Sequence, residues 1–154
     1  MKVIFAGNNL RGIVCLKYLI KKKLNIPLVI GHPKKDPSSY YSNLKKISQK
    51  YKIKYIAPKN INSNKVFKLI GRLKPDLMIL VGYSNSILKK KIFSIPKYGT
   101  LNLHASKLPY YRGGSPLNWA IINNEKKIGI SIILVDEGID TGPIISQLKN
   151  IKIK

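Results

Sequence analysis

The sequence has few acidic residues, few histidines and a single cysteine. Its 154 residues include 6 Asp and Glu, 2 His and only Cys15. One cysteine cannot form an internal disulfide, and its place in the apolar helical pattern LRGIVCLKYLI favours a packed core thiol. Two histidines and one cysteine, without H-x-x-x-H or C-x-x-C spacing, do not supply the ligands of a zinc site. No metal site is therefore predicted.

Long apolar runs are also absent. No segment approaches the roughly 20 apolar residues of a membrane-spanning helix, and the early run VIFA is shorter than the ~7–15 residues of a signal-peptide core. The composition, 44% hydrophobic and 23% charged, is typical of a folded domain. We therefore expect a cytoplasmic protein with one hydrophobic core and no membrane partner.

Basic residues greatly outnumber acidic ones. The chain has 29 Lys and Arg against 6 Asp and Glu, a formal net charge of +23. A charge of this size attracts nucleic acids and anionic metabolites. However, the lysines are spread along the whole chain and accompany many asparagines and isoleucines, as a general compositional drift also produces. We favour drift, and a dedicated nucleic-acid-binding face is the alternative.

Strand-like and helix-like segments alternate over the first two thirds of the chain. Helices are expected over about residues 10–23, 40–51 and 62–73, and strands at KVIFAG, IPLVIGH, KYIAP and DLMILVG. This alternation predicts an α/β, Rossmann-like fold with a mostly parallel sheet flanked by helices. Ligands of such folds bind beyond the carboxyl ends of the strands. The candidate ligand-facing loops therefore follow Ala6, Ile30, Val81 and His104.

The pattern changes after residue 104. A loop leads to a short helical stretch over about residues 116–123, followed by the strand-like runs IGISIILV and PIISQLK. The segment DEGIDTG links these two runs. No internal repeat or linker is visible, so we predict a single domain over residues 1–154.

The loop after the first strand, GNNLRG, lacks two common phosphate-binding signatures. It matches neither G-x-G-x-x-G nor G-x-x-x-x-G-K-[ST], so a dinucleotide or triphosphate held in the usual way is not expected. Asn8 and Asn9 lie near a helix N-terminus, where their amides contact a polar ligand or simply cap the helix. His32 follows the second strand and either lines the same edge or is a loop residue without a role.

Asn102, His104 and Asp140 form the sharpest candidate site. Asn102 and His104 are two residues apart in a strand-like segment, so they share one face. Asp140 lies in DEGIDTG, which holds three of the few acidic residues. Together an amide, an imidazole and a carboxylate can supply an oxyanion donor, a proton-transfer group and an orienting group. A strand end, a loop histidine and a solvated turn are an equally good interpretation of the same spacing.

Two longer blocks resemble the formyltetrahydrofolate-dependent formyltransferases. The run LNLHASKLPYYRGGSPLNWAI is similar to the family's pattern of Asn-x-His-x-Ser, Leu-Pro, an aromatic residue, Arg-Gly, Pro and a second aromatic residue. The matching positions are Asn102, His104, Ser106, Leu108, Pro109, Tyr111, Arg112, Gly113, Pro116 and Trp119. The second block, Gly-x-[Ser/Thr] followed by Asp-x-Gly-x-Ile and Gln, matches Gly129, Ser131, Asp140, Gly142, Ile144 and Gln147. The resemblance runs from residue 1 to about 148.

The resemblance implies a Rossmann-like formyltransferase fold and transfer of a formyl group from 10-formyltetrahydrofolate to a primary amine, without a metal. It implies that Asn102, His104 and Asp140 are the catalytic residues, and that the pterin contacts the backbone of residues 81–88 and the loop 136–140. The folate-binding residues implied are Val81, Gly82, Tyr83, Ile87, Leu88, Arg112, Gly113, Asp136 and Gly138. The expected substrate contacts are Asn8, Asn9 and Ala105.

The acceptor amine is less directly indicated. SPLNWAI and the region 32–58 look more like enzymes that formylate nucleotide-linked amino sugars than like methionyl-tRNA formyltransferase. We therefore expect a nucleotide-sugar substrate, with tRNA second and glycinamide ribonucleotide third. A homodimer is a further expectation, and a non-catalytic folate- or nucleic-acid-binding homologue is the alternative of a different class. Family members normally continue beyond the second block, so part of the usual C-terminal length is expected to be missing.

Overall fold

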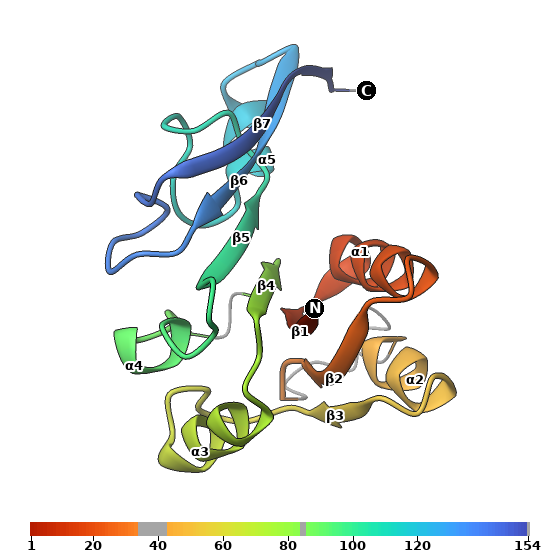
Figure 1. Cartoon of the computed structure of the whole chain (residues 1–154). Coiled ribbons are helices and arrows are strands. Elements are labelled where there is room, and N and C mark those ends of the chain that lie inside the picture. Colours follow the sequence, from red (N-terminus) through yellow and green to blue (C-terminus); the bar gives the residue numbers. More distant parts are fainter. Residues whose placement is uncertain (34–42, 84–85, 154) are drawn as a thin grey trace. The chain divides into compact units, whose positions relative to one another are not determined.

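The computed structural model describes residues 1–33, 43–83 and 86–153 (Figure 1). These residues form two compact units, Met1–Thr100 and Leu101–Lys154. No helix in the described ranges is long and apolar enough to cross a membrane.

The first unit is built on a parallel sheet. Its strands are β1 (Lys2–Gly7), β2 (Asn25–Ile30), β3 (Lys54–Ile56) and β4 (Leu77–Val81). They lie in the order β3-β2-β1-β4, and β1 pairs in parallel with both β2 and β4. In β1 the run from Val3 to Gly7 is entirely buried. Such a continuous buried run is expected where helices cover both faces of a parallel sheet.

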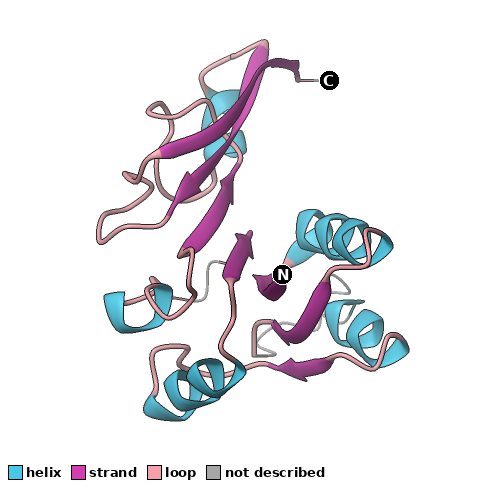
Figure 2. Ribbon diagram, in the orientation of Figure 1, coloured by secondary structure: helices cyan, strands magenta, loops and turns pink. Residues whose placement is uncertain are grey.

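Helices cover both faces of this sheet (Figures 1 and 2). They are α1 (Asn9–Lys21), α2 (Asn43–Lys50), α3 (Asn64–Leu73) and α4 (Lys90–Phe93). The pair α1 and α2 packs on one face, and the pair α3 and α4 packs on the other. Ser63 caps α3, since its hydroxyl accepts a hydrogen bond from the N–H of Val66 at 3.4 Å. This arrangement confirms the α/β, Rossmann-like class predicted from the sequence.

The predicted elements of the first unit are confirmed in order, with small shifts at their ends. The helix expected over 10–23 is α1, and the one expected over 62–73 is α3. The start of the helix expected over 40–51 and most of the turn-rich segment after His32 lie outside the described residues. The helix α4 was not predicted, because four residues are too few to show a helical period.

The apolar pattern of α1 corresponds only in part to a core face. Ile13 and Leu16 are buried, whereas Leu10 and Val14 are 61% and 59% exposed. Cys15, expected as a packed core thiol, is only half-buried. Desolvation nevertheless raises the pKa of this thiol, against a smaller opposing effect of the nearby Arg11 charge.

The second unit is an antiparallel sheet with one helix. It contains β5 (Thr100–His104), whose first residue belongs to the first unit, with α5 (Pro116–Ile122), β6 (Lys127–Leu134) and β7 (Ile144–Lys152). The strand β6 pairs in antiparallel fashion with β5 and with β7. The sequence predicted these strands, but the apolar pattern within one strand does not by itself define the direction of the strand beside it.

Truncation of α1 side chains tests the division between its buried and exposed apolar residues. Leu16 is fully buried, so Leu16→Ala should lower the free energy of unfolding by about 2–5 kcal/mol. The matched variant Leu10→Ala removes the same atoms from an exposed position and should change it by less than about 0.5 kcal/mol. Urea denaturation of both variants measures the difference, and equal losses would contradict the burial of Leu16.

Candidate active site

The strand β5 places Asn102 and His104 on one face, as their spacing predicts. In the antiparallel ladder Asn102 lies opposite Ile133 and His104 lies opposite Ser131. His104 is only 6% exposed, whereas Asn102 is partly exposed. The imidazole is therefore largely shielded from water, and the neighbouring amide remains accessible.

Asp140, in the loop between β6 and β7, joins this pair. Its Oδ1 accepts a hydrogen bond from Nδ2 of Asn102 at 2.9 Å, and its Oδ2 accepts one from the N–H of Gly113 at 2.9 Å. Oδ2 also lies 3.3 Å from Nδ1 of His104. The structure thus brings together the three side chains that the sequence singled out. Gly113 joins them through its main chain, a contact that the sequence did not indicate.

Both ring nitrogens of His104 face polar groups. Its Nε2 lies 2.7 Å from the carbonyl oxygen of Tyr111, which can only accept a hydrogen bond, so Nε2 carries a proton. The other nitrogen, Nδ1, faces the Asp140 carboxylate. That contact is an ion pair when Nδ1 also carries a proton. Both ring nitrogens therefore have polar partners, which hold the ring of His104 in place.

The side-chain amide of Asn102 can donate a second hydrogen bond. Nδ2 carries two hydrogens, and one of them is donated to Asp140. The second has no partner among the described residues. A neutral N–H donor, fixed by a carboxylate and partly exposed, is suited to bind the oxygen of a carbonyl group.

A buried hydroxyl fixes the loop that follows β5. Ser131 on β6 donates to the carbonyl of Ser106 at 2.7 Å and accepts from the N–H of Leu108 at 3.1 Å. Gln147 on β7 donates to Ser131 and to the carbonyl of Leu108. The polar residues of the two sequence blocks therefore join β5, β6 and β7 to the loop that carries Tyr111 and Gly113.

The loop that carries Asp140 is also tightly constrained. Asp136 accepts hydrogen bonds from the N–H of Gly138 and the hydroxyl of Thr141, so its carboxylate is used inside the turn. A Cβ on Gly142 would lie 1.7 Å from the carbonyl oxygen of Leu134, so no larger residue fits without moving the backbone. Asp140 itself has φ +51°. The turn thus directs the Asp140 carboxylate toward β5.

Several predicted ligand-binding residues lie in the first unit. The N–H of Asn8 bonds to the carbonyl of Val81, and the amide of Asn9 lies 2.7 Å from where a Cβ on Gly82 would be. Glycine is favoured at position 82 for two reasons: its φ is +62°, and a Cβ there would contact Asn9. Ser84 and Asn85, within the predicted pterin segment, lie outside the described residues.

The remaining predicted residues differ in exposure. Leu88 is buried, and Ile87 and Arg112 are exposed. Ala105, next to His104 in sequence, is partly exposed. None of these side chains has a hydrogen bond or ion pair with another described residue that would assign it a role, so their ligand contacts stay predictions.

His32 and Tyr83 meet at the carboxyl ends of β2 and β4. Their rings pack edge to face with centroids 4.8 Å apart. Partial burial lowers the pKa of His32 and favours its neutral form. His32 therefore packs against Tyr83 within the first unit, a contact that the sequence pattern does not indicate.

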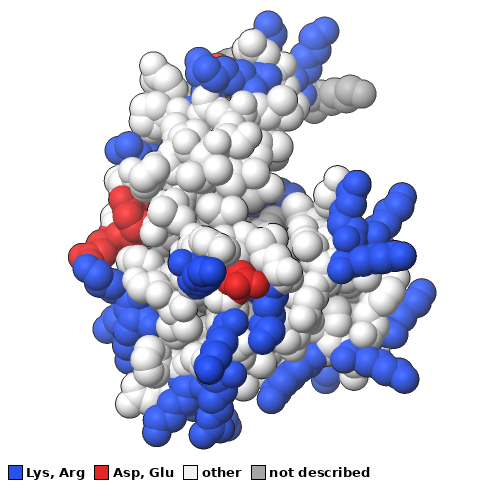
Figure 3. Space-filling view, viewed as in Figure 1, with Lys and Arg blue, Asp and Glu red and all other residues white. Residues whose placement is uncertain are grey.

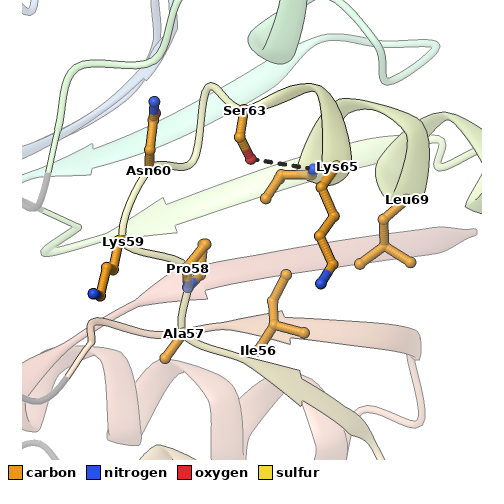
Figure 4. Close-up of a pocket in the computed structure, with 9 residues that line it drawn as sticks. Ile56, Ala57, Pro58, Lys59, Asn60, Ser63, Lys65 and Leu69 are labelled. Carbon is orange, nitrogen blue, oxygen red and sulfur yellow. Dashed lines mark hydrogen bonds between the residues drawn. The ribbon is translucent and has the colours of Figure 1, made fainter.

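A cavity of about 460 Å³ lies at the carboxyl end of β3 (Figure 4). The loop 56–60 forms one wall, and the first turns of α3 form the other. Its lining is mostly apolar, and Figure 4 shows the Lys65 side chain extending from α3 into the space between Ile56 and Leu69. This is the edge of a parallel sheet where ligands of α/β folds bind.

The chain belongs to the formyl transferase family. The model of that family, described as "Formyl transferase", matches residues 1–154.

Curated relatives agree with this assignment. The chain is 38% identical over 152 residues to a methionyl-tRNA formyltransferase of Kosmotoga olearia, covering 96% of this chain and 48% of the relative. It is 43% identical over 156 residues to the bifunctional polymyxin resistance protein ArnA of Wigglesworthia glossinidia brevipalpis, covering 100% and 24%. The chain thus spans about half the length of the methionyl-tRNA formyltransferase and a quarter of the ArnA protein.

Solved structures share the fold. The phosphoribosylglycinamide formyltransferase of Bacillus halodurans matches with a TM-score of 0.81 and 23% identity, over 100% of this chain and 81% of that one. WlaRD, a sugar 3N-formyl transferase solved in the presence of dTDP and 5-N-formyl-THF, matches with a TM-score of 0.66 and 24% identity, over 96% and 50%. The fold class predicted from the sequence is therefore confirmed.

Removing the Ser131 hydroxyl tests how the loop after β5 is held. Ser131→Ala leaves the buried N–H of Leu108 and carbonyl of Ser106 without this partner, which should cost about 1–3 kcal/mol of unfolding free energy. Ser146→Ala, an exposed change on the neighbouring strand β7, is the matched control and should be neutral within about 0.5 kcal/mol. Thermal denaturation compares the two. A neutral Ser131→Ala would mean that this hydroxyl does not fix the loop.

Proposed function

We propose that this chain transfers a formyl group from 10-formyltetrahydrofolate to a primary amine. The observation that carries the proposal is the cluster in which the Asp140 carboxylate binds the Asn102 amide and faces the His104 imidazole. The chain also belongs to the formyl transferase family. The groups fit the chemistry, because formyl transfer needs an N–H donor at the carbonyl oxygen and an acceptor for the proton of the amine.

Asn102 supplies the donor at the carbonyl oxygen. When the amine attacks the formyl carbon, negative charge develops on that oxygen, and the second Nδ2 hydrogen of Asn102 stabilises it. The bond to Asp140 fixes the amide before the reaction begins, so no reorganisation is needed at that moment. When both of its ring nitrogens carry protons, His104, held between Asp140 and the Tyr111 carbonyl, adds a positive charge that assists Asn102.

Asp140 accepts the proton of the attacking amine. The nitrogen becomes positively charged as the new C–N bond forms, and it must lose a proton before the product is stable. The Asp140 carboxylate takes this proton directly or through a water molecule. The bond between the formyl carbon and the folate nitrogen then breaks, that nitrogen takes up a proton, and the C=O bond is restored.

We infer that the folate is held by main-chain groups of residues 81–88 and of the loop 136–140. The exposed Ile87 and the partly exposed Gly82 and Tyr83 support the first of these contacts. In the second, Asp136 acts by shaping the turn, because its carboxylate is bonded to Gly138 and Thr141.

For the acceptor we propose the amino group of a nucleotide-linked amino sugar. The stretch SPLNWAI and the sugar formyl transferases among the structural matches support it. The second candidate is methionyl-tRNA, favoured by the tRNA formyltransferases among the curated relatives. In the view of Figure 3, Lys and Arg lie in several groups with uncharged surface between them, not in one continuous basic face.

Removing either Asn102 or Asp140 should lower turnover strongly without unfolding the chain. Asn102→Ala deletes the donor at the carbonyl oxygen and should lower kcat by about 10²–10³. Asp140→Ala deletes both the proton acceptor and the group that fixes Asn102, and should abolish detectable activity. The assay follows formation of tetrahydrofolate with 10-formyltetrahydrofolate and an amine acceptor, and circular dichroism checks the fold.

Asn118→Ala, an exposed change on α5, is the matched control for Asn102→Ala and should keep full activity. If Asn102→Ala or Asp140→Ala remains folded and turns over at the rate of the parent chain, the assigned roles are wrong.

A direct acceptor screen separates the two candidate substrates. The chain is incubated with 10-formyltetrahydrofolate and either amino-sugar nucleotides or charged initiator tRNA, and products are weighed by mass spectrometry. We expect a gain of one formyl group on an amino-sugar nucleotide. Formylation of the methionyl-tRNA alone would mean that the acceptor is the tRNA and not the amino sugar.

A further inference from the structure

Asn62 joins two loops of the first unit by a pair of hydrogen bonds. Its Nδ2 donates to the carbonyl oxygen of Ile87 at 2.9 Å, and its Oδ1 accepts from the N–H of Lys89 at 2.8 Å. One side-chain amide thus makes both bonds that the main chain of a neighbouring strand would make to residues i and i+2. The connection spans 25 and 27 residues of sequence.

The turn that carries Asn62 is itself well fixed. Ile61 is fully buried, and the N–H of Asn62 donates to Oδ1 of Asn60 at 2.8 Å. The next residue, Ser63, caps α3. Because the backbone at Asn62 is already fixed, its side chain loses little additional conformational entropy when it bonds to a second segment. Its hydrogen bonds therefore hold that segment effectively.

The two bonds define the shape of residues 87–89. Leu88 is 6% exposed and anchors the segment, whereas the Ile87 side chain is 65% exposed. Because Asn62 occupies the carbonyl of Ile87 and the N–H of Lys89, the main-chain groups between them are those of Leu88. Neither the N–H nor the carbonyl of Leu88 has a hydrogen-bond partner among the described residues. The segment therefore combines an exposed apolar side chain with a main-chain donor and acceptor that have no partner among the described residues.

We propose that Asn62 is a positioning residue that holds residues 87–89 in the conformation that binds the pteridine ring of the folate. A flat heterocycle with ring nitrogens and an amino group needs an apolar surface and main-chain donors and acceptors, and this segment offers both. The inference rests on the proposed function. Asn62 itself does not touch the reacting atoms, and it acts through Ile87 and Leu88.

The test measures folate binding apart from catalysis. The full chain and its variants are titrated with 5-formyltetrahydrofolate by calorimetry, and hydrogen exchange of the Lys89 amide is followed by NMR. Asn62→Ala removes both bonds, and the nearly isosteric Asn62→Leu removes them without leaving a gap. Both should weaken binding about tenfold, as the loss of two such hydrogen bonds implies, and both should speed exchange at Lys89.

Asn64→Ala is the matched control. Asn64 is also an asparagine at the start of α3, and its Oδ1 accepts only a contact of 3.3 Å from Nζ of Lys91. The dissociation constant of the Asn64→Ala variant for 5-formyltetrahydrofolate should stay within about twofold of the parent value. In turnover assays the Asn62 variants should raise KM for the folate and leave KM for the amine and kcat nearly unchanged. A merely structural role would lower the melting temperature without this selective change.

The outcomes separate this inference from the proposed function. If the parent chain binds 5-formyltetrahydrofolate and both Asn62 variants bind it equally well, the role of Asn62 is refuted and the proposed function stands. If the parent chain does not bind it at all, both proposals fall together.

Discussion

The carboxylate of Asp140 accepts hydrogen bonds from the Asn102 amide and from the main chain of Gly113, and it faces the imidazole of His104. These partners come from β5 and from the loop that follows it, whereas Asp140 comes from the loop between β6 and β7. A partly buried carboxylate is stable only when such donors replace the water it has lost. The conformations of both loops therefore depend on this one charge.

The sequence predicted the side chains of the site better than its main-chain contacts. The two-residue spacing of Asn102 and His104 determines their shared face, and the concentration of acidic residues indicates the segment of Asp140. By contrast, the Tyr111 carbonyl and the Gly113 N–H leave no trace in the pattern, because every residue has such groups. The hydrogen bonds of Ser131 to the loop after β5 could not be predicted from the sequence either, because they join residues distant in the chain.

A similar limit applies to the fold. Alternating segments predicted the α/β class and the order of the elements, because burial imposes a period on each element. Periodicity identifies the apolar face of a helix but not whether another element covers it. It therefore could not show that Leu10 and Val14 on α1 are exposed. The antiparallel direction of β6 and β7 depends on the length and turn of the connection.

Asp140 has a φ of +51°, a backbone conformation in which a side chain is crowded and glycine is not. This crowding costs on the order of 1 kcal/mol for most residues. Glycine would relieve this crowding, but it would also remove the carboxylate that binds Asn102 and Gly113. Backbone strain at one residue and the joining of two loops are therefore inseparable at this position.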